Sequence, residues 1–246
     1  MPDISYQLYC SRNFPPLADT CAMLAKAGFT QVEGFGGLFE DPDGLKAALD
    51  ANGLAMTSSH MGFDLVEENP ARGLEIANAL GIKKVFVPFV MPDDRPTDED
   101  GWQAFGKRVA EAGKPFRDAD LTFGWHNHDF EFAALPSGKM PMELMAEADI
   151  DLELDLGWVG RAGLDPVAWI NHFGSRIKAV HVKDIAPQGE NTDEDGWADV
   201  GHGTMDWAAI HAALQANGIT HYVVEHDNPN DHARFARRSI ASIKAF

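Results

Sequence analysis

The stretch Ile177-Lys-Ala-Val-His-Val-Lys-Asp184 is a short apolar run that ends in a histidine, a lysine and an aspartate. Three other segments have the same form, with acids or histidines at the end of an apolar run: residues 121–128, 152–157 and 222–227. Short apolar runs of this kind are typical of strands buried in a parallel sheet. The repetition therefore predicts several strands whose polar ends converge.

Glycines that follow helical patterns divide the rest of the chain. Each of them comes just after apolar residues at helical spacing, and a strand candidate follows it. A glycine in this position can adopt the left-handed conformation that ends a helix. These glycines are Gly28, Gly53, Gly81, Gly174 and Gly218. With the first strand this predicts eight strands, at residues 4–9, 31–34, 55–59, 84–89, 121–126, 151–155, 177–182 and 222–225. Helices are predicted between them, at residues 15–27, 42–52, 70–80, 98–116, 140–148, 166–173, 205–217 and 231–245.

Strands that alternate with helices indicate βαβ units and a parallel sheet. Eight such units predict a single α/β domain over residues 1–246, a (β/α)₈ TIM barrel, with an open doubly wound sheet as the alternative. The longest irregular segment, residues 185–202, follows the seventh predicted strand. Long loops at that end of a barrel usually serve the active site, although this one could also be a solvated insertion.

The composition restricts the partners of the chain. It carries 38 acidic and 20 basic side chains, a formal net charge of -18, which disfavours nucleic acid and anionic membranes. Cys10 and Cys21 are expected to be reduced thiols. We find neither a signal peptide nor an apolar run of about 20 residues, so a soluble cytoplasmic protein with a small-molecule partner is expected. Homo-oligomer formation is left open.

Histidines and carboxylates recur where the predicted strands end. In a barrel these ends meet at one face, and unpaired charges are too costly to collect there without a purpose. A mixture of imidazole and carboxylate suits Mn²⁺, Co²⁺, Zn²⁺, Fe²⁺ or Ni²⁺, and a carboxylate-rich one admits Mg²⁺. The favoured ligands are Asp155, His181 and Glu225, whereas strand five leaves the choice open among His126, His128 and Glu131.

Several longer motifs then carry a family resemblance that covers essentially the whole chain. They are Trp125-His-Asn-His-Asp-Phe-Glu-Phe132, Glu153-Leu-Asp-Leu-Gly-Trp158, His181-Val-Lys-Asp184, Val200-Gly-His-Gly-Thr-Met-Asp-Trp207 and Val224-Glu-His-Asp227. With them the chain resembles the sugar phosphate isomerase/epimerase family of the xylose isomerase-like TIM barrel superfamily.

The resemblance implies a metal held by Asp155, His181 and Glu225. It also places His126 where the ketose epimerases of the family have a metal-binding glutamate, and Trp158 where many relatives have a substrate-binding histidine. The histidine-rich end of strand five is more similar to the branch of inosose dehydratases and keto-glycoside enzymes.

These observations lead to one functional hypothesis. It is an isomerase or epimerase that acts on a keto sugar or keto polyol through an enediolate, with one divalent ion (Mn, Co, Mg or Zn). The residues expected to carry it are His126, Asp155, His181 and Glu225 for the metal, Glu225 and His128 for proton transfer, and Lys183, Glu131, His60 and Trp158 for the substrate, with Asp184 tethering Lys183. The alternatives are a metal-dependent dehydratase or lyase of the inosose dehydratase or 3-keto-glycoside type, and a non-catalytic sugar-binding barrel.

Overall fold

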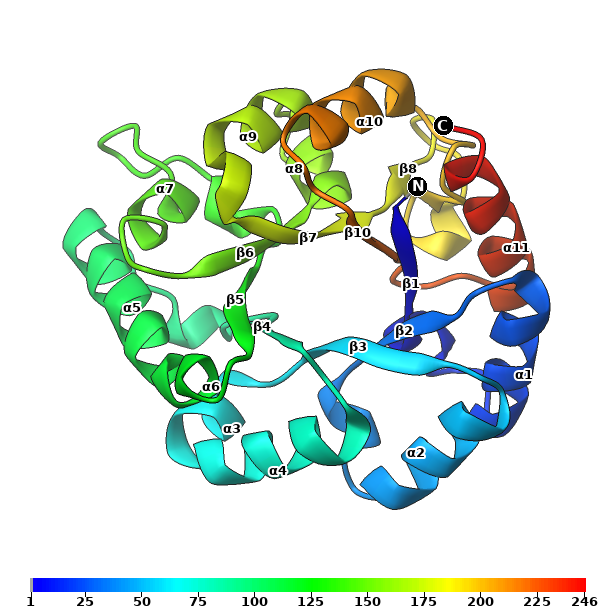
Figure 1. Cartoon of the computed structure of the whole chain (residues 1–246). Helices are drawn as coiled ribbons and strands as arrows, with labels where there is room; N and C mark the ends of the chain where they lie inside the picture. The colour runs from blue at the N-terminus through cyan, green and yellow to red at the C-terminus, as the bar shows by residue number, and fades with distance from the viewer. Residues whose placement is uncertain (1) are drawn as a thin grey trace.

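Eight parallel strands form a closed barrel with helices around its outside, as Figure 1 shows for this computed structural model, which describes residues 2–246. The barrel order is β1-β10-β7-β6-β5-β4-β3-β2, so the first strand closes the barrel against the last. The predicted barrel is confirmed. Its strands are β1 (Asp3–Gln7), β2 (Gln31–Gly34), β3 (Ala55–His60), β4 (Lys84–Val87), β5 (Thr122–His126), β6 (Asp151–Asp155), β7 (Ile177–Val182) and β10 (His221–Val224).

The helices fill the intervals between the strands. They are α1 (Leu17–Ala27), α2 (Pro42–Ala51), α3 (Phe63–Glu68), α4 (Pro70–Leu80), α5 (Glu99–Ala112), α6 (Lys114–Asp118), α7 (Pro141–Met145), α8 (Leu156–Arg161), α9 (Pro166–Phe173), α10 (Trp207–Ala216) and α11 (His232–Ile243). Short 3₁₀ helices lie at Leu8–Ser11, Gly36–Leu38, Pro92–Asp94, Phe130–Phe132, Gly174–Arg176 and Thr192–Glu194. In the described part of the chain, no helix is long and apolar enough to cross a membrane.

The glycines that predicted helix ends adopt the expected backbone. All five have a positive φ, and Gly28 and Gly81 are left-handed C-caps of α1 and α4. One predicted helix, residues 98–116, is instead divided into α5 and α6. Pro115 explains the division, because proline has no N–H to continue the hydrogen bonding of the preceding helix.

The barrel has an apolar outer layer and a polar interior near its carboxyl end. Strand β6 shows why: Leu152 and Leu154 alternate with Glu153 and Asp155, and successive side chains of a strand point to opposite faces. All four side chains are fully buried. The leucines belong to the apolar core, so the two acids point the other way, into the barrel. Cys10 and Cys21 are both buried and free, as expected.

The long loop after β7 is held together by one carboxylate. It contains a two-stranded antiparallel sheet, β8 (Asp184–Ile185) and β9 (Trp197–Ala198). The fully buried Asp184 accepts hydrogen bonds of 2.8–3.2 Å from the backbone N–H groups of Ile185, Gly201, Gly203 and Met205 and from Trp207 Nε1. The expectation that Asp184 tethers Lys183 is therefore wrong, because its two oxygens are occupied by the loop.

His221, at the start of β10, is expected to make stability depend on pH. Its Nε2 lies 3.3 Å from the hydroxyl of Ser58, and burial, followed by the charge of Lys84, lowers the pKa of His221 to about 4. The pKa in an unfolded chain is about 6.5, so only the unfolded state binds this proton between about pH 6.5 and pH 4. The contribution of neutral His221 is present above pH 6.5 and is lost as the pH falls through that window.

Between pH 7 and pH 5, the free energy of unfolding of the wild type should therefore fall by about 2 kcal/mol more than that of His221→Gln. Urea unfolding of both proteins at the two pH values measures the difference. An equal loss in both would contradict neutral burial of His221.

Candidate metal centre and active site

A cavity of about 530 Å³ opens beside the carboxyl ends of the strands. Its lining combines titratable side chains, His60, His126, His128, Glu225 and Asp227, with the aromatic rings of Tyr9, Phe35, Phe89 and Trp158. Among the lining residues found in the described part of the chain, none comes from residues 185–202. That loop supports the site from behind, since the Trp197 ring packs on the Trp158 ring with 4.9 Å between centroids.

The four predicted metal ligands lie together, and we call them the outer group: His126, Asp155, His181 and Glu225. Each offers one ligand atom, and these atoms lie within 4.8 Å of one another. His181 Nδ1 is 2.8 Å from Glu225 Oε2 and 3.6 Å from Asp155 Oδ2, and His126 Nε2 is 4.0 Å from the same Asp155 oxygen. His128 and Glu131 are outside this group, so His126 is the strand-five residue that the fold brings to it.

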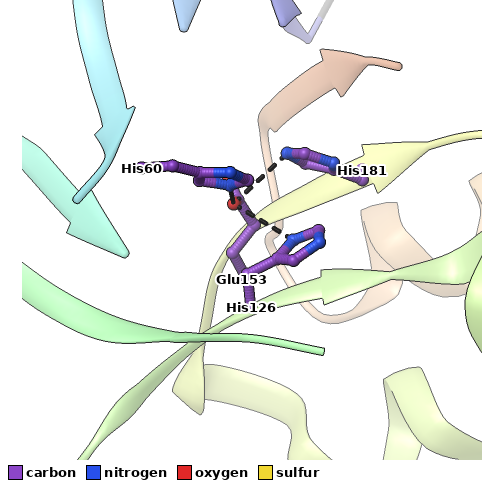
Figure 2. A group of neighbouring side chains, drawn as sticks. All are labelled: His60, His126, Glu153 and His181. Atoms are coloured by element: carbon purple, nitrogen blue, oxygen red, sulfur yellow. Dashed lines mark hydrogen bonds and ion pairs between the residues drawn. The ribbon is translucent and has the colours of Figure 1, made fainter. Parts of the chain in front are cut away.

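A second group lies against the first, and we call it the inner group: His60, His126, Glu153 and His181. Figure 2 shows the three imidazoles pointing toward one oxygen of Glu153. Glu153 Oε2 is 2.6 Å from His60 Nε2, 3.2 Å from His181 Nε2 and 3.4 Å from His126 Nδ1. Glu153 was not among the site residues predicted from the sequence. The signal was its spacing, because residues two apart on a strand share a face and Asp155 was already a candidate ligand.

Glu33 on β2 lies beside both histidine-rich groups. Its Oε1 is 2.8 Å from His181 Nε2 and 3.3 Å from His60 Nε2, and it accepts a hydrogen bond of 2.8 Å from the side-chain amide of Gln7. The inner nitrogens of His60 and His181 therefore face two carboxylates. In metal sites, such partners of the second imidazole nitrogen set the orientation of a histidine ligand.

The outer group fits a divalent ion by its donors and by one unpaired atom. Asp155 uses Oδ1 to cap α8 by accepting from the Trp158 N–H, whereas its Oδ2 is buried without a hydrogen-bond partner among the described residues. Burial, followed by the charge of His181, lowers the pKa of His126 to about 4, so this imidazole is neutral, as a ligand must be. Two nitrogens and two carboxylate oxygens suit Mn²⁺, Co²⁺ or Zn²⁺.

Glu225 carries a negative charge next to Lys183. Burial acts to raise the pKa of Glu225, but the charges of Lys183 and His181 outweigh it and hold this pKa well below its usual value. Lys183 Nζ lies 3.1 Å from Glu225 Oε2 and 2.7 Å from Asp227 Oδ1. Burial acts against the charge of Lys183, but Asp227, Glu225 and Asp155 raise its pKa, so the ammonium stays charged.

His128 is a neutral imidazole at the edge of the cavity. Burial, followed by the neighbouring His126 and the charge of Lys183, holds the pKa of His128 well below its usual value. Its ring packs against Phe89 at 5.1 Å and Trp158 at 5.3 Å between centroids. Nδ1 of His128 is buried without a hydrogen-bond partner within the described residues. A nitrogen in this state can receive a proton from a bound molecule.

The residues expected to bind substrate have different positions. His60 and Trp158 line the cavity, whereas Glu131 and Lys183 are fully buried and are not among the lining residues found. Glu131 Oε1 accepts from Trp125 Nε1 and its Oε2 accepts from the His128 N–H, both at 2.8 Å. In this arrangement Glu131 holds the backbone that carries His128, and Lys183 holds Glu225 and Asp227.

Metal binding at the outer group should stabilise the fold. We expect Mn²⁺ at 100 times its Kd to raise the free energy of unfolding of the chelator-treated protein by about 2.7 kcal/mol. Asp155→Asn should lose this gain, because it removes the carboxylate that faces the ion while its remaining oxygen can still cap α8. Thermal and urea unfolding with and without Mn²⁺ measure the effect.

Asp165→Asn is the matched control for Asp155→Asn. Asp165 caps α9 by accepting from the Val167 N–H and belongs to neither of the two groups. The Asp165→Asn variant should keep the full increase in the free energy of unfolding that Mn²⁺ causes. An equal gain in Asp155→Asn and in the wild type would exclude Asp155 as a ligand.

Comparisons with known proteins agree with the fold. The sequence model of a family described as xylose isomerase-like TIM barrel matches residues 21–246. An inosose dehydratase of Lacticaseibacillus casei is 24% identical over 167 residues, which cover 59% of this chain and 56% of that protein. The alignment thus spans little more than half the length of this curated relative.

Solved structures of similar shape cover nearly the whole chain. A sugar phosphate isomerase/epimerase from Parabacteroides distasonis has a TM-score of 0.82 at 24% identity and covers 99% of this chain and 94% of its own. The 3-keto-D-glucoside 4-epimerase from E. coli has a TM-score of 0.69 at 19% identity, with 100% of each chain covered. At these identities the likeness shows the fold alone.

Proposed function

Because the chain belongs to the xylose isomerase-like TIM barrel family, we propose that it is a metal-dependent isomerase or epimerase of a keto sugar or keto polyol. The observation that carries the proposal is the outer group at the edge of the cavity that His128 also lines. The site combines ligands for an ion, an ionised carboxylate and a neutral imidazole within reach of one bound molecule.

The residues of the outer group supply the means to acidify a carbon next to a carbonyl. A divalent ion held by His126, Asp155, His181 and Glu225 would act as a Lewis acid toward the carbonyl of the substrate. Lys183 holds the neighbouring Glu225 in place and, together with His181, keeps it ionised. Asp227 in turn holds the ammonium group of Lys183. The titratable side chains that line the cavity would hold the polar groups of a sugar ring, and the aromatic ones, among them Trp158 and Phe89, its apolar face.

Two side chains are suited to move the proton. The contacts of Glu225 with His181 and Lys183 both end on Oε2, which leaves Oε1 to accept a proton. His128 is the second proton-transfer group, because it is neutral and faces the same cavity. Return of the proton to the other face of the carbon gives an epimer, and its return to the neighbouring carbon gives an isomer.

A dehydratase or lyase is the second candidate. It is favoured by the similarity to the inosose dehydratase and by the histidines His126 and His128 at the end of β5, where the chain departs from the ketose epimerases. The same enediolate that leads to an epimer would then lose an oxygen from the next carbon. The residues proposed to form it are unchanged.

One experiment separates the candidates. The metal-loaded protein is incubated in D₂O with keto sugars, inososes and 3-keto-glycosides, and NMR follows both isotope exchange and products. Deuterium uptake with products of unchanged composition supports an isomerase or epimerase, whereas loss of water or of an aglycone supports a lyase. The enzyme proposal is contradicted if no substrate of the panel exchanges or reacts with Mn²⁺, Co²⁺, Mg²⁺ or Zn²⁺ present.

A further inference from the structure

His126 and His181 belong to both the outer and the inner group, but they use different nitrogens in each. His126 presents Nε2 to Asp155 and Nδ1 to Glu153. His181 presents Nδ1 to Asp155 and Glu225 and Nε2 to Glu153. The two groups are therefore two potential metal positions on opposite edges of the same two imidazole rings.

A histidine binds an ion only in its neutral form, which has one nitrogen with a free lone pair and one that carries a hydrogen. Each shared histidine can therefore bind an ion on one edge only, and its other nitrogen donates a hydrogen bond. With an ion in the outer group, the inner nitrogen of His126 would donate to Glu153 and that of His181 to Glu33. With an ion in the inner group, their outer nitrogens would donate to Asp155 and Glu225. Occupation of one position excludes the other.

The two positions differ in the chemistry of their donors. The inner group offers three imidazole nitrogens and one carboxylate oxygen. Glu153 Oε2 lies 3.2 Å from His181 Nε2 and 3.4 Å from His126 Nδ1, close to the spacing of about 3.3 Å between ligands of a tetrahedral zinc ion, whereas its 2.6 Å distance to His60 Nε2 would have to lengthen. Such a nitrogen-rich, four-ligand set suits Zn²⁺. The outer group replaces one imidazole and Glu153 by two other carboxylates, a donor set that is more favourable to Mn²⁺ or Mg²⁺.

An independent observation also points to a ligand in the inner group. His126 Nδ1, the nitrogen that faces Glu153 Oε2, is buried without a hydrogen-bond partner within the described residues, as is the other oxygen of Glu153, Oε1. Both side chains are almost completely buried, with 2% of His126 and none of Glu153 exposed. Two members of the inner group, His60 and His126, also line the cavity.

We propose that the inner group is a second metal position, selective for Zn²⁺, and that Zn²⁺ bound there excludes the ion of the outer group. This inference rests on the proposed function in one respect, because it takes the outer group to be the position of the catalytic ion. Zn²⁺ at the inner group and Mn²⁺ at the outer group would then compete, although they are held by different carboxylates.

Two variants separate the positions, because His60 belongs only to the inner group and Asp155 only to the outer group. His60→Gln keeps an amide near the position of Nε2, which can still donate to Glu153, but removes the imidazole ligand. We expect it to weaken Zn²⁺ binding by more than about tenfold, since even the loss of a partner behind a ligand costs about that much. Mn²⁺ binding should stay unchanged. Asp155→Asn should do the reverse.

Chelator competition and calorimetry give both affinities and the number of ions per chain, and Co²⁺ serves as a spectroscopic probe. In Asp155→Asn, Co²⁺ should show the intense visible bands of a four-coordinate ion, and these should be absent in His60→Gln. Circular dichroism checks that both variants fold; if His60→Gln does not, Glu153→Gln replaces it.

Equal Zn²⁺ affinity in the wild type and in the inner-group variant would overturn the proposal, as would simultaneous binding of Zn²⁺ and Mn²⁺ to one chain. Loss of Mn²⁺ binding in Asp155→Asn with Zn²⁺ binding retained would support it. If the wild type bound neither ion, both this inference and the metal-dependent function would fail. If it bound Mn²⁺ alone, only this inference would.

Discussion

Glu225→Gln is expected to lower the turnover of any keto-sugar substrate by about 10²–10⁴-fold, the usual contribution of a positioned acid or base. Glu225 is ionised because Lys183 and His181 outweigh the effect of burial on its pKa. An amide of the same size keeps the shape of the site, but it cannot accept the proton and is a poor ligand. The loss should therefore appear in kcat and not only in KM, since in the proposed mechanism the carboxylate takes the proton from the reacting carbon.

Deuterium exchange followed by NMR measures the effect on the substrate that the panel identifies. Glu190→Gln is the control, because Glu190 is exposed on the loop after β7 and lies in neither metal group. It removes the same charge and should leave turnover unchanged. Activity of Glu225→Gln within a factor of about three of the control would remove Glu225 from the mechanism, because general acid–base catalysis contributes far more than that.

Asp184→Asn is expected to destabilise the protein by about 3–5 kcal/mol, the scale on which loss of a buried, multiply bonded charge is felt. Oδ1 of Asp184 accepts from the N–H groups of Ile185 and Met205. Oδ2 accepts from those of Gly201 and Gly203 and from Trp207 Nε1. An asparagine can present oxygen to only one of these sets, so its NH₂ group faces two or three donors whichever way it turns.

Urea unfolding measures the loss, with Asp206→Asn as the control. Asp206 caps α10 by accepting from the Ala209 N–H, and an asparagine caps almost equally well. Gly203→Ala tests the same contact from the other side, because a Cβ at Gly203 would lie 2.3 Å from Asp184 Oδ1. A loss in Asp184→Asn no larger than in Asp206→Asn would mean that the loop does not depend on this carboxylate.

Local chemistry was enough to predict the order of elements. Glycines such as Gly28 and Gly81 end helices because their backbone conformation is costly for other residues, and this can be read without the fold. Helices α3 and α8 were not predicted, because each has only six residues, too few for a periodic pattern to show, and begins within three residues of the end of a strand. The prediction of one helix over residues 98–116 did not allow for Pro115, which divides α5 from α6.

The residues of the candidate site that lie at the carboxyl ends of the strands could be predicted from the sequence. His126, Asp155, His181 and Glu225 were expected to meet because the carboxyl ends of parallel strands share one face, and they do meet. The partners of a long side chain are decided by packing instead. Lys183 pairs with Asp227, 44 residues away, rather than with the adjacent Asp184, and nothing in the sequence separates these two acids.

The closure of the barrel also decides when the site can exist during synthesis. Strand β1 pairs with β10, from Asp3 with His221 to Tyr6 with Val224, and Glu225 follows directly after that final strand. A growing chain makes its first strand early and must wait for its last, so more than two hundred residues leave the ribosome before the ring can shut. Until then the outer group lacks one of its carboxylates. In a nascent chain the outer group is therefore incomplete until the barrel that buries it has closed.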